Sequence, residues 1–174
     1  MESVQVTKQR FGIIGNDTKL NRAIEKAIKV SPTDISVLVI GESGVGKESI
    51  PRIIHSLSHR KHAKYIAVNC GAIPEGTIDS ELFGHEKGAF TGANQQKQGI
   101  VETSNGRMLY LDEIGNIPRE KQNVFLRFLQ FGEWKKVGED HINRSEIQIV
   151  AATNKDINNP DVFAQDIKDR FHEI

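Results

Sequence analysis

Several features are scarce in this 174-residue sequence, and each scarcity narrows what the protein can be. Its single cysteine, Cys70, cannot form an internal disulfide and is typical of a reducing compartment. Lysine plus arginine equals aspartate plus glutamate at 23 each, so no bulk positive charge indicates a nucleic-acid surface. No apolar run approaches the length of a membrane span, and the polar lead over residues 1–10 lacks the apolar core of a signal peptide. We expect one cytoplasmic domain with a real core and no membrane partner.

A glycine-rich turn at residues 41–48, GESGVGKE, follows an apolar run that predicts a strand over residues 36–40. The apolar-periodic segment after it predicts a helix over residues 47–57. In this order the backbone N–H groups of the turn can converge on a phosphate at the helix N-terminus, and Lys47 can reach the β and γ phosphates. Glu48 stands where the general motif has Ser or Thr as a Mg²⁺ ligand, so a glycine turn with an incidental lysine is the alternative. The predicted phosphate-binding residues are Glu42, Ser43, Gly44, Val45, Gly46 and Lys47.

A second apolar run, residues 108–111, ends in two adjacent carboxylates, Asp112 and Glu113. Asp112 can hold Mg²⁺, directly or through water, and Glu113 can polarise a water molecule for attack on a γ-phosphate. Adjacent carboxylates at the end of a strand are often solvated surface charges, but the upstream phosphate turn favours a catalytic pair.

Two asparagines are predicted at the same edge of the sheet. Residues 65–69 predict a strand that ends in Asn69, and the buried run at residues 147–152 leads to Asn154. Because α/β sheets place their chemistry at the carboxyl ends of parallel strands, both side chains are expected near the two carboxylates. An asparagine that merely ends a strand is the alternative for Asn154.

Glycines flank one phenylalanine, Phe90, in residues 84–93, GHEKGAFTGA. A large apolar side chain at the tip of a glycine loop is unfavourable in water, so it indicates a contact with a partner. A hairpin tip folded back on the core is the alternative.

The remaining segments predict helices and connections around the sheet. Asp17 or Thr18 is the predicted N-cap of the first helix. Pro51 is expected to remove a hydrogen bond just beyond the first turn of the phosphate helix. The other predictions are a short strand at residues 100–103, an amphipathic helix at 119–131 that buries Val124, Phe125, Phe128 and Leu129, and a last helix at 162–171.

These motifs together resemble the AAA+ domain of bacterial enhancer-binding proteins, the activators of sigma-54 RNA polymerase. Residues 88–93 match that family's GAFTGA loop letter for letter, and residues 41–48 match its GESGTGKE apart from Val45. Glu48 is the usual family residue at its position. Residues 68–70, 81–86, 111–115 and 151–154 are also similar to family segments in the right order. The resemblance implies an α/β fold: a P-loop NTPase AAA+ core with a parallel sheet flanked by helices.

The same resemblance implies a ring-forming ATPase, usually a hexamer, that holds ATP and Mg²⁺ between neighbouring subunits. It implies Ile14 and Gly15 near adenine, Lys47 and Glu48 at the phosphates and metal, Asp112 on Mg²⁺, and Asn154 as the sensor of the γ-phosphate. Glu113 would activate water, and Asn69 would hold Glu113 in an inactive rotamer until the nucleotide state releases it. The loop implied to contact sigma-54 consists of Gly88, Ala89, Phe90, Thr91, Gly92 and Ala93.

Some residues depart from the family pattern. The last helix of the family carries two arginine fingers, of which this chain keeps Arg170 and replaces the first with Ala164. Lys136 stands where the family often has arginine. A nucleotide-binding sigma-54 interaction module with weak turnover is therefore the alternative to an active ATPase. No helical lid, regulatory domain or DNA-binding domain is recognised, so residues 1–174 are expected to be a core fragment whose contact with DNA needs another domain.

Overall fold

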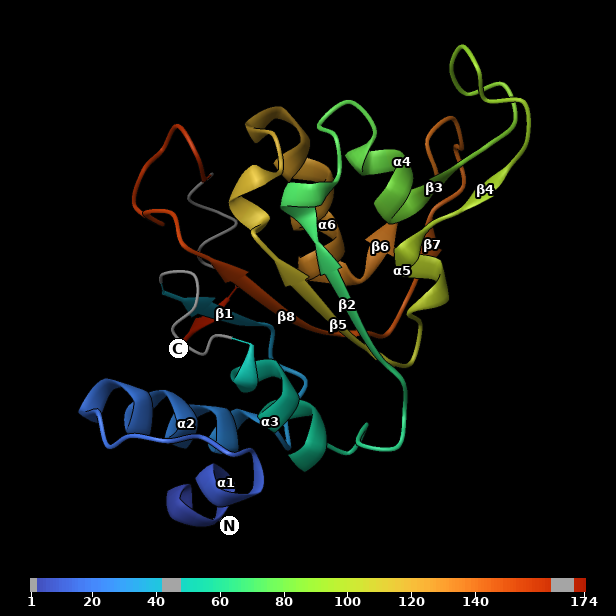
Figure 1. Cartoon of the computed structure of the whole chain (residues 1–174). Coiled ribbons are helices and arrows are strands. Elements are labelled where there is room, and N and C mark those ends of the chain that lie inside the picture. The colour runs from blue at the N-terminus through green and yellow to red at the C-terminus, as the bar shows by residue number, and fades with distance from the viewer. Residues whose placement is uncertain (1–2, 42–47, 164–170) are drawn as a thin grey trace.

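A parallel sheet of five strands lies at the centre of the protein (Figure 1). The computed structural model describes residues 3–41, 48–163 and 171–174. In spatial order the strands are β2 (Tyr65–Asn69), β5 (Met108–Asp112), β8 (Gln148–Thr153), β1 (Val37–Ile40) and β9 (His172–Glu173). All neighbouring pairs are parallel, so the carboxyl ends of the strands lie at one edge. The expected α/β architecture is confirmed.

Helices cover both faces of the sheet (Figure 1). One face carries α1 (Val4–Arg10), α2 (Thr18–Val30) and α3 (Ser49–Leu57). The other carries α4 (Ile78–Phe83), α5 (Ile100–Thr103) and α6 (Gln122–Phe131), with the 3-10 turns η1 (Cys70–Ala72), η2 (Ile114–Asn116) and η3 (Arg119–Lys121). Two hairpins adjoin this second face, made by β3 (Gly84–His85) with β4 (Lys97–Gln98) and by β6 (Glu133–Trp134) with β7 (Asn143–Arg144).

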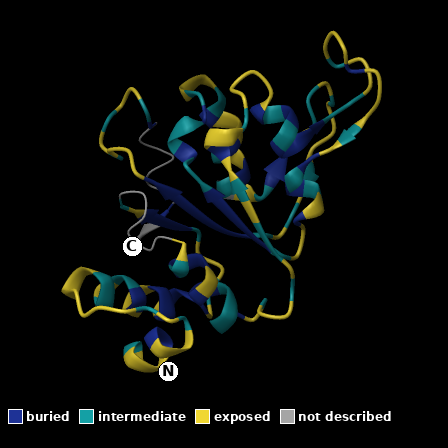
Figure 2. Ribbon diagram, viewed as in Figure 1, coloured by how far each residue is buried: buried dark blue, intermediate teal, exposed yellow. Residues whose placement is uncertain are grey.

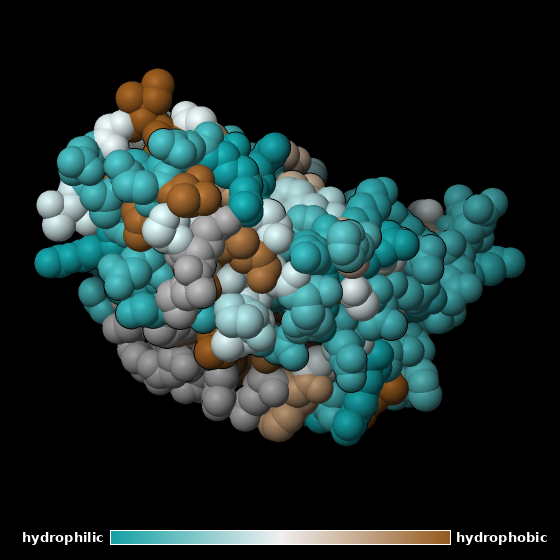
Figure 3. Space-filling view, turned by 90° about the horizontal axis from the view of Figure 1, so that it is seen from below, coloured by the Kyte–Doolittle hydropathy of each residue, from teal (hydrophilic) through white to brown (hydrophobic). Residues whose placement is uncertain are grey.

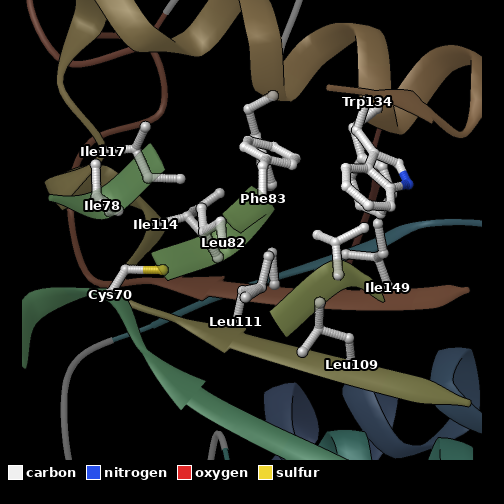
Figure 4. Packing of buried hydrophobic residues seen from close by; sticks show 14 of the residues in the cluster. Cys70, Ile78, Leu82, Phe83, Leu109, Leu111, Ile114, Ile117, Trp134 and Ile149 are labelled. Carbon is white, nitrogen blue, oxygen red and sulfur yellow. The ribbon is translucent and has the colours of Figure 1, made fainter. Parts of the chain in front are cut away.

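Alternating side chains along the strands divide the core into two clusters. In β5, Met108 and Tyr110 pack with α2 and α3, whereas Leu109 and Leu111 pack with α4 and α6. Successive side chains of a strand point to opposite faces, so a strand covered on both sides needs an apolar residue at every position. Figure 2 shows the resulting buried centre, and Figure 4 shows the second cluster with Phe83 of α4 above the strands.

Helix α2 shows how a cap and an apolar stripe define one element. The Asp17 side chain accepts a hydrogen bond from the N–H of Lys19 at 2.9 Å, which identifies it as the N-cap. Ile24, Ala27 and Ile28 form the buried side of the helix. These three residues pack in one buried cluster with Val37 and Val39 of β1, so this side of the helix faces the sheet.

Three segments differ from the prediction. Residues 100–103 form helix α5 instead of a strand, because N–H and hydroxyl groups in and next to the segment bond to local carbonyls. Residues 4–10 of the polar lead form helix α1, which packs on α2. Strand β9 at residues 172–173 was not predicted, and the predicted last helix before it falls mainly on residues 164–170, outside the described residues.

Two single residues also differ. Val124 is 48% exposed, so its place in the buried stripe of α6 is wrong. Gln122 is buried in that helix instead, because its side-chain amide donates to the carbonyls of Ile117 at 3.3 Å and Val162 at 2.6 Å. Pro51 is the third residue of α3, where its missing N–H is one of the first four that have no partner within a helix. It therefore removes no helical hydrogen bond.

The face seen in Figure 3 is mostly hydrophilic, with small and separate hydrophobic patches. Among the residues that the structure describes, no helix is both long and apolar enough to cross a bilayer. Single exposed apolar side chains are common on soluble surfaces. Two of them bear on the candidate site: Ile14, which is 95% exposed, and Phe90, which is 46% exposed.

Candidate functional site

The carboxyl ends of β2 and β5 bring Asn69 and Asp112 side by side, because these residues are register partners. At the same edge the N–H of Gly41, where the glycine-rich turn begins, donates to the carbonyl of the last residue of β8 at 3.2 Å. Strands β1 and β8 therefore bring the start of the turn and Asn154 to the edge that holds the carboxylates. Residues 42–47 of the turn lie outside the described residues.

Glu113 has a left-handed backbone, with φ 54° and ψ 47°, although it is not a glycine. Its N–H donates to Asp112 Oδ1 at 2.9 Å. Its carboxylate lies against η1, since a Cβ at Gly71 would stand 2.0 Å from Glu113 Oε2 and 3.1 Å from Asn69 Oδ1. Asn69 Oδ1 accepts a hydrogen bond from the N–H of Gly71 at 2.8 Å. The absent side chain at Gly71 leaves room for both polar groups, and strained backbone of this kind clusters at functional sites.

A pocket of 310 Å³ opens beside Asp112, between β2, β5 and the start of α3. It is lined by Glu48, Arg52, Tyr65, Ala67, Val68, Asn69, Tyr110 and Asp112. The rings of Tyr65 and Tyr110 stack with centroids 6.4 Å apart. The Tyr110 hydroxyl is buried and has no hydrogen-bond partner among the described residues. Motif reasoning missed Tyr110, although a position two residues before Asp112 places both side chains on one face of the strand.

The two phenols of this pocket are weak acids. Burial raises the pKa of Tyr65 to about 12, with Arg52 opposing the shift and Glu48 and Asp112 adding to it. Burial, followed by the Asp112 carboxylate, also raises the pKa of Tyr110 above its ordinary value. Both hydroxyl groups therefore keep their protons at neutral pH and can donate hydrogen bonds.

Cys70 follows Asn69 directly and is fully buried. Burial raises the pKa of its thiol to about 12, and the Asp112 and Glu113 carboxylates act in the same direction. A buried thiol that stays protonated is a poor nucleophile, so Cys70 is a packing residue of the core.

Residues 88–93 form the tip of the β3–β4 hairpin, which projects away from the sheet (Figure 1). The exposed Phe90 ring packs edge-on against His85, with ring centroids 4.9 Å apart. The His85 ring is fixed at both nitrogens, Nδ1 by the Ser80 hydroxyl at 2.7 Å and Nε2 by the carbonyl of Gln95 at 3.0 Å. The loop therefore stands away from the core, as a partner contact requires, while its phenylalanine contacts its own hairpin.

The β6–β7 hairpin is bonded to the base of the first hairpin. The N–H of Glu86 donates to the carbonyl of Val137, and the N–H of Val137 donates to the carbonyl of Gly84, both at 2.9 Å. At Gly138, a Cβ would stand 2.8 Å from Cβ of Ala89. A displacement of one hairpin therefore also displaces the other.

Comparison with known proteins identifies the family. The sequence model of the Sigma-54 interaction domain matches residues 13–173. The chain belongs to this family. The Nif-specific regulatory protein of Azorhizobium caulinodans is 43% identical over 167 residues, which are 94% of this chain and 27% of that protein. The formate hydrogenlyase transcriptional activator FhlA of Escherichia coli K12 is 40% identical over 157 residues, 90% of this chain and 23% of that protein.

Solved structures agree with the observed fold. NtrX from Brucella abortus in complex with ATP superposes with a TM-score of 0.82 at 28% identity, covering 98% of this chain and 38% of that one. The P-loop NTPase domain of a sigma-54 activator from E. coli gives a TM-score of 0.59 at 14% identity over 92% of this chain and 96% of that one, a likeness of fold. The predicted α/β fold is thereby confirmed. The chain spans about a quarter of the length of the two curated relatives.

Other parts of the domain surround the site without a motif to mark them. The buried Lys8 donates from Nζ to the carbonyl of Gly15, beside the exposed Ile14, and to Asn21 Oδ1 at 3.0 Å. Lys155 Nζ donates to Asn116 Oδ1 at 3.1 Å and so joins η2 to the end of β8. Both lysines hold a segment in place through a carbonyl or amide oxygen, a role that leaves no recognisable spacing in the sequence. Arg170 lies outside the described residues.

Proposed function

We propose that this sigma-54 interaction domain binds ATP with Mg²⁺ at the carboxyl edge of the sheet and hydrolyses it to move the 88–93 loop against sigma-54. The observation that carries the proposal is the pairing of Asn69 with Asp112, next to Glu113, at the edge where β1 leads into the glycine-rich turn. The ATP complex of the related NtrX supports ATP as the ligand. The outcome of hydrolysis would be a remodelled closed complex of RNA polymerase.

Mg²⁺ fits the donors at this edge. Asp112 and Glu48 both line the pocket at the start of α3, and carboxylate oxygens are the ligands that this hard cation prefers. The N–H of Glu113 already fixes one oxygen of Asp112. When bound there, Mg²⁺ supplies positive charge that balances the phosphate oxygens.

Each predicted site residue has a separate task in this proposal. Ile14 and Gly15 lie at the adenine. Residues 42–46, Lys47 and Glu48 bind the phosphates, and Asn154 contacts the γ-phosphate. Glu113 polarises the attacking water, and Asn69 restrains Glu113 until nucleotide releases it. Because the Glu113 carboxylate packs on η1 at Gly71, its departure toward the water changes the contacts of η1.

Turn η1 offers a route from this site to the loop. It leads through a short connection into α4, whose last residue directly precedes Gly84 of β3. Cys70 of η1 and Ile78, Leu82 and Phe83 of α4 belong to one buried cluster (Figure 4). A close-packed cluster transmits a shift from one end to the other, so we infer that a change in the position of the Glu113 side chain displaces the base of the hairpin.

The intact protein would act as a homo-oligomeric ring, in the family usually a hexamer, with Arg170 reaching the neighbouring site. An arginine finger supplied in trans is worth about three to five decades of rate, so Ala164 in the first finger position favours a second candidate function. That candidate is a module that binds ATP and sigma-54 with weak turnover. Contact with DNA would come through another domain.

The ATPase rate as a function of protein concentration separates the two candidates. A site completed by a neighbour gives a specific activity that rises with concentration, whereas the module binds ATP with little turnover at any concentration. A protein that binds no adenine nucleotide would refute both candidates.

The partner is tested by capture of sigma-54 in the presence of an ATP transition-state analogue. We expect wild type to retain sigma-54 and Thr91→Ala to lose it, because Thr91 is exposed on the hairpin tip. Thr18→Ala is the matched control, since it removes an exposed threonine hydroxyl on the opposite face of the sheet. Equal capture by Thr91→Ala and wild type would show that the loop does not bind sigma-54.

A further inference from the structure

The pocket beside Asp112 contains one polar group whose role the proposed function leaves open. Tyr110 is 5% exposed and its hydroxyl is buried, yet that hydroxyl has no hydrogen-bond partner within the described structure. Buried polar groups are nearly always paired in folded proteins, because an unpaired one loses its bonds to water and gains nothing in return. The hydroxyl therefore calls for an acceptor, and none stands within hydrogen-bond distance of it among the described residues.

Strand geometry identifies that acceptor. Tyr110 and Asp112 lie on the same face of β5, which is covered by α3, and Tyr110 is the register partner of Ala67 while Asp112 is that of Asn69. The Ala67 side chain is a methyl group and offers the hydroxyl no acceptor. Asp112 Oδ1 accepts from the N–H of Glu113, so Oδ2 is the oxygen available for a second donor.

The remaining groups of the pocket do not offer a better match. Arg52 carries only donors, which cannot accept a proton from a phenol. The Tyr65 ring stacks on the Tyr110 ring, but no hydrogen bond joins their hydroxyl groups among the described residues. Asn69 Oδ1 already accepts from the N–H of Gly71. Glu48 is the N-cap residue of α3, whereas Asp112 lies two residues from Tyr110 on the same face of one strand.

We propose that Tyr110 is a positioning residue that donates its hydroxyl proton to Asp112 Oδ2 and so orients the carboxylate toward Mg²⁺–nucleotide. This inference rests on the proposed function, because it assigns Asp112 to the metal. The hydrogen bond forms when the bound ligand fixes the carboxylate, which satisfies the buried hydroxyl at the same time. The loss of a side chain that hydrogen-bonds to a metal ligand typically changes metal affinity by about 10- to 100-fold.

The test is Tyr110→Phe in the full 174-residue chain, with Tyr65→Phe as the matched control. Both variants remove one phenol oxygen from the same pocket and keep the ring. Binding of a fluorescent ADP analogue is titrated with Mg²⁺ and repeated in EDTA, and thermal unfolding is followed in EDTA. We expect Tyr110→Phe to need about tenfold more Mg²⁺ for half-maximal binding and to bind like wild type in EDTA. Tyr65→Phe should match wild type throughout.

Thermal unfolding distinguishes positioning from simple packing. Because the Tyr110 hydroxyl has no hydrogen-bond partner among the described residues, its removal should leave the melting temperature in EDTA unchanged or raise it. An unchanged Mg²⁺ requirement in Tyr110→Phe, or a lowered melting temperature in EDTA with equal weakening in both titrations, would overturn the inference. A wild type that shows no Mg²⁺-dependent nucleotide binding would instead refute the proposed function, and the inference with it.

Discussion

The base of the β3–β4 hairpin is a close crossing of two backbone segments, and we expect it to tolerate no side chain at Gly99. A Cβ at Gly99 would stand 2.3 Å from the nitrogen of Gly84, 2.4 Å from the carbonyl carbon of Phe83 and 2.6 Å from the oxygen of Leu82. All three are backbone atoms, so none can rotate away. Since ordinary contact begins at 3.4 Å, Gly99→Ala must open the crossing by about 1 Å.

Overpacking of this kind costs about 1–3 kcal/mol, and three backbone contacts place Gly99→Ala at the upper end. For a protein of this size each kcal/mol lowers Tm by about 2–4 °C, so we expect a loss of about 6–12 °C. Alanine substitutions at two other glycines serve as references for Gly99→Ala. Gly76→Ala meets no atom within 4 Å and should be neutral or slightly stabilising, because it restricts the unfolded chain. Gly106→Ala also meets no atom, but its φ of +76° should cost about 1–2 kcal/mol through strain alone.

The assay is thermal unfolding by circular dichroism, followed by nucleotide binding and sigma-54 capture of the folded variants. Gly99→Ala should keep nucleotide binding, because the site lies at the ends of the sheet strands, and should lose capture, because the hairpin base is displaced. A Gly99→Ala protein as stable as Gly76→Ala would refute the reasoning. So would a variant that loses nucleotide binding but retains the wild-type Tm.

Three further changes test other parts of the structure. Glu113→Gln should keep nucleotide binding and lower the rate of phosphate release by about 10²- to 10⁴-fold, as loss of a general base does; an unchanged rate would remove Glu113 from catalysis. Arg127→Ala and Arg144→Ala should each lower the free energy of unfolding in urea by about 0.5 kcal/mol. The double variant should lower it by about 2 kcal/mol, because Glu133 is 9% exposed and would lose both of these arginine partners. A double-variant loss equal to the sum of the two single losses would contradict this prediction. The pKa of Cys70 is raised from 9.0 to about 12 in the folded state. Between these two pKa values the unfolded chain loses the thiol proton and the folded chain keeps it, so the free energy of unfolding falls as pH rises through this range. Cys70→Ala should therefore lose less stability than wild type between about pH 8 and pH 10.5 in urea titrations.

The sheet and the positions at its edge could be predicted because they depend on short-range patterns. Each predicted central strand is an apolar run of a few residues, and its neighbours in sequence are glycine, asparagine or carboxylate residues. A parallel sheet brings such strand ends together whatever the details of packing. For this reason Asn69 and Asp112 were expected near each other from their places in the chain, and the register pairs them.

The features that escaped prediction depend on contacts between distant segments. Val124 has the period of a buried residue, but the buried side of α6 is decided by the Gln122 amide, which reaches the carbonyl of Val162. Tyr110 looked like any apolar strand residue, because only the fold reveals that its hydroxyl ends beside a pocket. The strained backbone of Glu113 and the contact of its carboxylate with Gly71 also require the meeting of η1 and η2. No local pattern encodes such meetings.

The distribution of hydrogen bonds and buried contacts indicates which part of the structure moves when the site changes. Strand β8 is buried at all six positions and is paired on both sides, so moving it disrupts two ladders and both core clusters. The β3–β4 hairpin is held by two-residue strands, and its tip at residues 88–92 is largely exposed, with Phe90 resting on His85. Local opening is easiest where buried contacts are few. A shift of η1 that reaches α4 is therefore expected to move the hairpins and leave the sheet in place, which makes the loop the moving part and the strand ends its fixed support.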